Sequence, residues 1–335
     1  MEIIGAVLKG LKLGDPATYA NLTVFPMFSE RNGNGNRGYL TLEEALANGL
    51  ARVREVSEGG SVPELLFQNL AELPVLIVDG EELVGAKQNR TANLTILAPA
   101  GKTIVIPVSC VEAGRWRYTS GDFKVSERAH FSRGRAARAA TVSRSMRNEG
   151  SRRSDQGRVW EDISCACQQL AAPSPTQAMA AIFDRHRTSI EDHVHAFRAI
   201  DRQVGALFAV GARISGFDLF DCPATLHAML AKLVRSYAVE AIGLPRPATR
   251  RPGRRRASTF VNTAAACEVE TYPAVGLGTD IRLTGPGVIA GGLVHDDRLI
   301  HLAAFATEHE VLAIARRGDR GMASARVRRD HQRRG

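Results

Sequence analysis

The chain contains 335 residues, of which 44% are hydrophobic, and it carries a formal net charge of +9 at pH 7. This length can bury the core of one large domain or of two ordinary ones, and no apolar run reaches the 18 residues that a membrane span needs. The N-terminal MEIIGAVLKG lacks the pattern of a signal peptide and five cysteines are too few for a disulfide framework, so we expect a cytoplasmic protein with reduced thiols.

The positive charge is concentrated in three arginine-rich segments. Residues 127–153, 241–258 and 316–335 each carry a net charge of +6, which leaves −9 for the rest of the chain. Such segments can bind nucleic acid or other anions, or they can be solvated linkers and a tail. Phe131 is the one aromatic residue within them, whereas binding of single strands uses several stacking rings. The sequence therefore favours the linker interpretation over nucleic-acid binding.

Residues 1–120 have the pattern of a β-rich region. Short runs rich in β-branched residues are bounded by Gly, Pro, Asn and Asp, as in Val75–Val78 and Thr103–Ser109. One short helix is predicted over Thr41–Leu50, where Thr41 and Glu44 form a capping box. Asp79-Gly80, placed between two apolar runs, predicts a tight hairpin whose two glutamates lie at its rim.

The remainder of the chain alternates helical and hairpin patterns. Residues 121–153, rich in Arg, Ser and Ala, are interpreted as a mobile connector, and residues 154–310 as an α+β part. This part contains a helix over Ala224–Ile242 and hairpins over 206–220 and 292–305. Residues 311–335 are predicted to be a disordered basic tail. The fold class is therefore α+β, with an N-terminal antiparallel β-sandwich-like region packed against a helical and hairpin C-terminal part.

The stretch 79–118 is the candidate functional site, because it combines many specific polar groups with short β-type runs. Glu82 and Glu112 are candidate general bases or ligands of a hard cation, since a carboxylate among apolar neighbours can have a raised pKa. The alternative for the two glutamates of the hairpin, Glu81 and Glu82, is that both are solvated residues at the ends of strands.

A second set of residues in this stretch is suited to a ligand. Lys87, Gln88, Asn89 and Arg90 offer two cations and two amides in a row, which suits phosphate or carboxylate together with ribose hydroxyls. Arg115 and Trp116 can complete the site, with the indole stacking on a base. A polar turn and a core tryptophan are the alternatives.

The residues 75–116, VLIVDGEELVGAKQNRTANLTILAPAGKTIVIPVSCVEAGRW, resemble a prokaryotic family, the ARG and Rhodanese-Phosphatase-superfamily-associated domain family. Softer similarity continues at SDQGRVWEDI (154–163) and GLVHDDRLIHLAAF (292–305), so that the resemblance covers about residues 1–310. The family is named for neighbouring genes that encode ADP-ribosylglycohydrolases and rhodanese-like phosphatases. The resemblance thus implies a link to NAD or ADP-ribose metabolism, but no particular reaction.

These observations lead to a functional hypothesis and an alternative. The hypothesis is a cytosolic enzyme or sensor that binds a small nucleotide-ribose ligand, such as ADP-ribose or an NAD-derived compound. The alternative is a non-catalytic interaction module that uses the same polar block as a partner or subunit surface. The sequence leaves the reaction, the metal and cofactor requirements and a homo-oligomeric state open.

Overall fold

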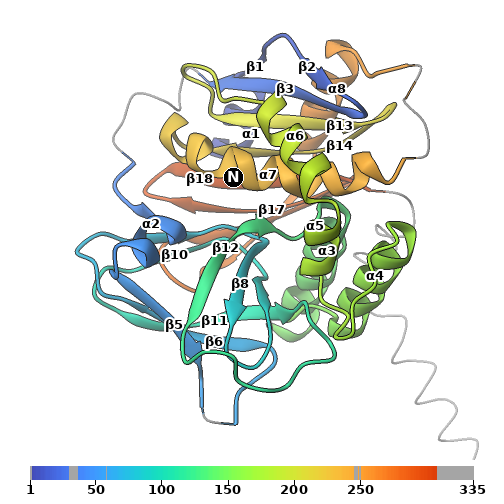
Figure 1. The fold of residues 1–335 in the computed structure, drawn as a ribbon. Coiled ribbons are helices and arrows are strands. Elements are labelled where there is room, and N and C mark those ends of the chain that lie inside the picture. The colour runs from blue at the N-terminus through green and yellow to red at the C-terminus, as the bar shows by residue number, and fades with distance from the viewer. Residues whose placement is uncertain (1, 30–36, 58, 245–247, 249, 308–335) are drawn as a thin grey trace, which may run out of the picture.

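A computed structural model describes residues 2–29, 37–57, 59–244, 248 and 250–307. It confirms the α+β class, since these residues form helices and several largely antiparallel sheets (Figure 1). The helices are α1 (Glu2–Lys9), α2 (Leu42–Ala47), α3 (Ser132–Glu149), α4 (Gln156–Gln169), α5 (Ala180–Arg185), α6 (Arg187–Ala196), α7 (Pro223–Ile242) and α8 (Arg254–Ala265). None of the helices in these residues is long and apolar enough to span a membrane.

The larger sheet has nine antiparallel strands and joins the two ends of the chain. Its order is β1-β3-β13-β14-β18-β17-β16-β15, with β2 also paired to β3. The strands are β1 (Leu11–Leu13), β2 (Ala17–Tyr19), β3 (Leu22–Ser29), β13 (Gly205–Val210), β14 (Arg213–Phe220), β15 (Glu268–Pro273), β16 (Thr279–Gly285), β17 (Val288–His295) and β18 (Arg298–Ala306). Alternate residues face opposite sides, so that Phe25 and Leu207 pack with α1 and α8, whereas Val24 and Phe208 pack with α7.

A second sheet of six antiparallel strands, in the lower part of Figure 1, carries the candidate site. Its order is β12-β8-β9-β11-β6-β5, and its end strands β12 and β5 also contact each other, so the sheet curls into a barrel-like shape. The strands are β5 (Ala51–Glu55), β6 (Glu64–Asn69), β8 (Glu81–Gly85), β9 (Arg90–Ala92), β11 (Thr103–Cys110) and β12 (Phe123–Ala129). A third sheet has three strands, β10 (Ile96–Ala98), β7 (Val75–Ile77) and β4 (Leu40–Thr41). In the sequence these strands alternate with those of the six-stranded sheet.

The arginine-rich segment expected to be a mobile connector is instead a strand and a buried helix. Residues 123–129 form β12, and α3 packs on both sheets: Ala139 and Ala140 contact the nine-stranded sheet, and Val142 and Met146 contact the barrel-like sheet. Small alanines allow this close approach, and the buried arginines of α3 are paired with carboxylates. Composition misled the sequence interpretation because it does not show which arginines have acidic partners.

The predicted hairpin at Asp79-Gly80 does not form. Gly80 has a φ of +90°, and the Glu81 N–H donates to the Val78 carbonyl, so the chain does turn here. However, β7 pairs with β10 and β4, whereas β8 pairs with β9 and β12, so the turn leads from one sheet into another. As a result Glu81 and Glu82 are buried and do not lie at a hairpin rim.

Other predicted elements are confirmed. Helix α2 begins after Thr41 with the capping box to Glu44, and α7 and the two hairpins, β13–β14 and β17–β18, occupy the expected residues. Strands β1, β2 and β3, expected in the β-rich region of residues 1–120, lie in the sheet of the C-terminal part. The predicted tail, 311–335, lies outside the described residues.

Candidate functional site

Two charged side chains point into one end of the barrel-like sheet. Arg90 begins β9 and shares its face with Leu83 and Cys110, its partners on the neighbouring strands. Glu55 ends β5 and follows the inward positions Ala51 and Val53 by the two-residue period of a strand. Both side chains are buried, and Arg90 Nη2 lies 3.9 Å from Glu55 Oε1. This end of the barrel therefore contains a buried charged pair.

The hydrogen-bonding capacity of this pair is only partly used. Arg90 Nη1 donates to Gln88 Oε1 at 2.9 Å, but Nε and Nη2 of Arg90 and Oε2 of Glu55 have no hydrogen-bond partner among the described residues. Burial lowers the pKa of the Arg90 guanidinium, against the opposing influence of Cys110 and Glu55. A buried polar group without a partner costs about 1–3 kcal/mol, and more when it is charged. Such groups are rare in native proteins, and a ligand is one way to supply the missing partners.

Glu112 and Arg115 hold the surrounding loops in place. Glu112 Oε2 accepts from Arg115 Nε at 2.8 Å and from the Asn89 N–H at 3.3 Å, while its Oε1 accepts from Thr176 Oγ1 at 3.0 Å. Arg115 also donates to Asn89 Oδ1 at 3.0 Å, and Gln88 Nε2 donates to the Glu112 carbonyl at 3.1 Å. Because their polar atoms are engaged with one another, these four residues form a scaffold around Arg90.

Aromatic rings cover the same end of the barrel. Trp116 is 49% exposed, with Arg90 Cζ 5.7 Å and Lys87 Nζ 5.3 Å from its ring centre. Tyr118 is 51% exposed and lies 5.1 Å from the same ammonium, which also donates to the Gly59 carbonyl at 2.6 Å. Half-exposed rings over cations can stack on an aromatic or sugar ligand. We call Glu55, Lys87, Arg90, Trp116 and Tyr118 the barrel-end cluster.

The predicted site residues thus gather at one place, except Glu82. Its side chain lies on the opposite face of β8 from Leu83, and its Oε2 accepts from Arg128 Nε and Ser126 Oγ, each at 2.8 Å. Glu55 and Tyr118 were missed by the sequence analysis. The alternation of ARVRE, which places Glu55 on the side of Ala51 and Val53, was the available signal for the former.

A second polar cluster lies buried between the two sheets. Asp79 Oδ1 accepts from Arg138 Nη2 at 2.9 Å and its Oδ2 from Arg135 Nε at 3.1 Å, while Arg135 also binds Asp218 through two bonds of 3.1 and 2.6 Å. The positive arginine and His301 hold the pKa of Asp218 below its usual value although burial alone would raise it. These contacts connect the turn before β8, helix α3 and strand β14.

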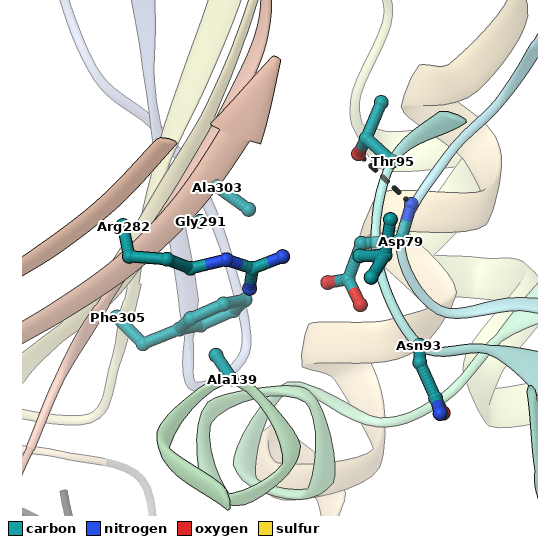
Figure 2. Close-up of a pocket in the computed structure, with 9 residues that line it drawn as sticks. Asp79, Asn93, Thr95, Ala139, Arg282, Gly291, Ala303 and Phe305 are labelled. Atoms are coloured by element: carbon teal, nitrogen blue, oxygen red, sulfur yellow. Dashed lines mark hydrogen bonds between the residues drawn. The ribbon is translucent and has the colours of Figure 1, made fainter. Parts of the chain in front are cut away.

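This cluster borders a small cavity, shown in Figure 2. Arg282, bound to Asp280 by bonds of 2.6 and 2.7 Å, points across it toward the Asp79 carboxylate, and Thr95 Oγ1 accepts from the Asp79 N–H. Gly291 makes room for the guanidinium, since a Cβ there would lie 2.7 Å from Arg282 Nη1.

The cavity also borders a hydroxyl–imidazole–carboxylate series. Thr95 Oγ1 lies 2.7 Å from His301 Nδ1, and His301 Nε2 lies 3.2 Å from Asp218 Oδ1. Such an order can activate a nucleophile, but the cavity has a volume of about 10 Å³, the space of roughly one water molecule. The series connects the segment between β9 and β10 with β18 and β14 of the nine-stranded sheet, and the barrel-end cluster is the stronger candidate for ligand binding.

Metal binding finds no support in the part of the chain that the structure describes. No group of three or more His, Cys, Asp or Glu side chains is placed there to hold an ion. Cys110, beside Arg90, is a free thiol whose pKa is raised by burial, so it is held as the neutral thiol.

Comparison with known proteins gives one match. The family model of the ARG and Rhodanese-Phosphatase-superfamily-associated Protein domain matches residues 10–305, which include both sheets and the barrel-end cluster. No curated protein and no solved structure matches the chain. Since the match spans most of the sequence, the chain belongs to the ARG and Rhodanese-Phosphatase-superfamily-associated Protein domain family.

Proposed function

We propose that this protein binds a small nucleotide-ribose ligand, such as ADP-ribose or an NAD-derived compound, at the barrel-end cluster. The observation that carries the proposal is Arg90, a fully buried guanidinium with two nitrogen atoms that have no partner in the described residues, lying beneath the half-exposed Trp116. A ligand that accepts hydrogen bonds from Arg90 and stacks on Trp116 would remove the cost of that arrangement. Binding is the step that an enzyme and a sensor would share.

Each residue of the site has a role in this proposal. Lys87 and Arg90 contact polar groups of the ligand and Trp116 stacks on its ring, whereas Glu112, Gln88, Asn89 and Arg115 hold the loops. Because Glu112 is fully engaged with its own neighbours, it positions the loops in preference to acting as a general base. Glu82 would act only indirectly, since it faces Arg128 on the other side of β8.

The proposal predicts that a nucleotide-ribose ligand stabilises the protein against heat. A ligand at 100 times its Kd adds about 2.7 kcal/mol to the free energy of unfolding, so millimolar ADP-ribose or NAD should raise the Tm by several degrees if binding is in the micromolar range. Trp116→Ala should weaken this binding about 10- to 100-fold, because stacking of a base contributes about 1–3 kcal/mol. Titration calorimetry measures the loss directly.

A control variant separates stacking from a general effect of losing an aromatic ring. Tyr19→Ala removes another exposed ring, on β2 of the other sheet, and should leave the affinity unchanged. Absence of a thermal shift across ADP-ribose, NAD, AMP and ribose 5-phosphate would exclude the proposal. If Trp116→Ala altered the oligomeric state and no ligand bound, the interaction-module alternative would gain support instead.

A further inference from the structure

The buried pair at the barrel end, Arg90 and Glu55, has no net charge. Its open donors and its open acceptor together suit a group that both accepts and donates hydrogen bonds. Arg90 offers donors at Nε and Nη2, and Glu55 offers an acceptor at Oε2. The closest approach of the two groups, 3.9 Å, joins Nη2 to the other carboxylate oxygen, Oε1, which accepts from the Lys87 N–H at 3.4 Å. This separation exceeds a hydrogen bond, so the two side chains do not satisfy each other, and a group that both accepts and donates could bond to both.

The charges decide which group fits. A phosphate beside Arg90 would also face the Glu55 carboxylate, and two anions within about 4–6 Å repel each other. An uncharged group that both accepts and donates hydrogen bonds meets no such penalty. A hydroxyl or a carboxamide can accept from Arg90 and donate to Glu55 at the same time.

The cation at the rim has a different environment. The Lys87 ammonium lies about 5 Å from the rings of both Trp116 and Tyr118, each of which is about half exposed to solvent. Lys87 itself is buried, so a ligand's phosphate would reach its ammonium between these rings, which face solvent. The two cations of the cluster thus differ: Arg90 is coupled to a carboxylate inside the barrel, whereas Lys87 lies beside half-exposed rings at the barrel end.

We infer that the barrel-end cluster selects ligands by an uncharged donor–acceptor group, a sugar hydroxyl or a carboxamide, which Glu55 and Arg90 bind inside the barrel while the ligand's phosphate stays at the rim near Lys87. This inference rests on the proposed function and adds an orientation and a specificity residue, Glu55. Entry of the ligand requires Trp116 to move, because Arg90 beneath it is fully buried.

The experiment compares ligands that differ in this one group. Calorimetric affinities are measured for ADP-ribose, for ADP-ribose lacking the hydroxyls of its terminal ribose, and for nicotinamide mononucleotide, using the wild-type chain and Glu55→Gln. We expect the wild type to prefer the ligands with the donor–acceptor group by about 10- to 100-fold, and Glu55→Gln to lose most of that preference. Nicotinamide mononucleotide also carries ribose hydroxyls, so nicotinic acid mononucleotide, which has a carboxylate in place of the carboxamide, is measured beside it. Weaker binding of the carboxylate form would identify the carboxamide as the group that is bound.

Two further variants control the comparison. Lys87→Met should weaken binding of every phosphate-bearing ligand alike and leave the preference intact. Glu72→Gln changes an exposed carboxylate in the loop at the opposite end of β6 and should change nothing. Trp116 fluorescence should respond to every ligand that enters, in a Trp160→Phe background that leaves one tryptophan.

The outcomes separate this inference from the proposed function. If ligands bind but removal of the hydroxyls has no effect, and Glu55→Gln tightens the binding of inorganic pyrophosphate, then the phosphate is bound at Arg90 and the inferred orientation is wrong while the site stands. If no ligand binds to the wild type, both fail. If circular dichroism shows that Glu55→Gln does not fold, the wild type decides the question: a preference for ADP-ribose over the form without the hydroxyls supports the inference, and equal affinities contradict it.

Discussion

Two buried arginines of this protein, Arg135 and Arg90, differ in how completely their guanidinium groups are paired. Arg135 donates three hydrogen bonds to Asp79 and Asp218, and its pKa is raised by these carboxylates although burial opposes this. Arg90 has one hydrogen bond and a lowered pKa. A fully paired buried charge stabilises one arrangement of the chain, whereas a half-paired charge retains affinity for something else.

His130 predicts how stability depends on pH. It is buried beside Arg138 and Arg135, and burial together with these cations lowers its pKa well below 6.5. The unfolded chain therefore takes up a proton near pH 6.5 that the folded chain does not, so stability falls as the pH drops below about 6.5, by up to about 1.4 kcal/mol per pH unit. Asp218, whose folded pKa is lowered, adds to the loss only below about pH 4.

Urea unfolding between pH 5 and 8 measures this dependence. His130→Asn keeps an acceptor for Arg138 and should flatten the decline between pH 6.5 and 5. His227→Asn, which changes an exposed histidine on α7, is the matched control and should leave the slope as in the wild type. An unchanged slope in His130→Asn would show that another group titrates.

Much of the candidate site could be predicted at the level of single residues, for a local reason. Lys87 to Arg90 are consecutive, and Glu112 to Trp116 follow the strand that pairs with β9, so the two sets meet wherever that pairing forms. Glu55 is different, because it reaches Arg90 only when the sheet curls and brings β5 close to β12. No local pattern encodes that closure. Glu82 was predicted as a site residue because the local pattern likewise does not show which way this side chain points in the folded sheet.

Among the elements, α3 shows what periodicity can and cannot indicate. Its residues SRGRAARAATVSRSMRNE contain few large apolar side chains, so the helix lacks an apolar face, yet two of its arginines and all four of its alanines are buried. The capping box predicted α2, and hydrophobic pattern predicted α7 because its buried face is largely apolar. The burial of α3 depends instead on carboxylates distant in sequence, Asp79 and Asp218, which a local pattern cannot supply.

Gly134 provides a test of how tightly α3 is held. A glycine inside a helix normally costs about 1 kcal/mol relative to alanine, so replacement usually stabilises. Here a Cβ at Gly134 would lie 2.3 Å from His130 Nε2, whose ring is fixed against Arg138 and Phe131. We expect Gly134→Ala to destabilise the protein by about 1–3 kcal/mol, as overpacked cores do.

The comparison for this variant is a glycine in another helix. Gly5 of α1 has open space around its Cβ position, so Gly5→Ala should be neutral or stabilising by up to about 1 kcal/mol. Denaturant midpoints of the two variants measure the contrast. Stabilisation by Gly134→Ala would mean that His130 can move away at little cost.

At the scale of the whole molecule, the two sheets are joined through charges as well as through apolar contacts. Asp79 leads into the barrel-like sheet, Arg135 and Arg138 lie on α3, and Asp218 belongs to the nine-stranded sheet. Because each partner belongs to a different structural layer, the network can be complete only when all three are assembled. We therefore expect the sheets to unfold together in the wild type.

Asp79→Asn tests this coupling. The variant leaves Arg138 without its carboxylate in a buried position, and loss of one partner of a buried pair costs about 3–5 kcal/mol. We expect that loss in denaturant unfolding, and we expect the transitions of circular dichroism and tryptophan fluorescence, coincident in the wild type, to separate. Asp122→Asn removes a half-exposed partner of Arg54, 3.9 Å away, and should cost less than about 1 kcal/mol.

Strand β3 has a consequence for how the chain is made. Its residues Leu22–Met27 pair with β13, which is synthesised about 175 residues later. At about 5–20 residues per second, a ribosome needs roughly 10–35 seconds to deliver that partner. During this interval the barrel-like sheet can fold. The edge of β3 that later pairs with β13 remains without its partner strand, and it can pair with other nascent chains. Slow elongation between residues 30 and 205 would therefore lower the yield of this protein more than slow elongation after residue 210.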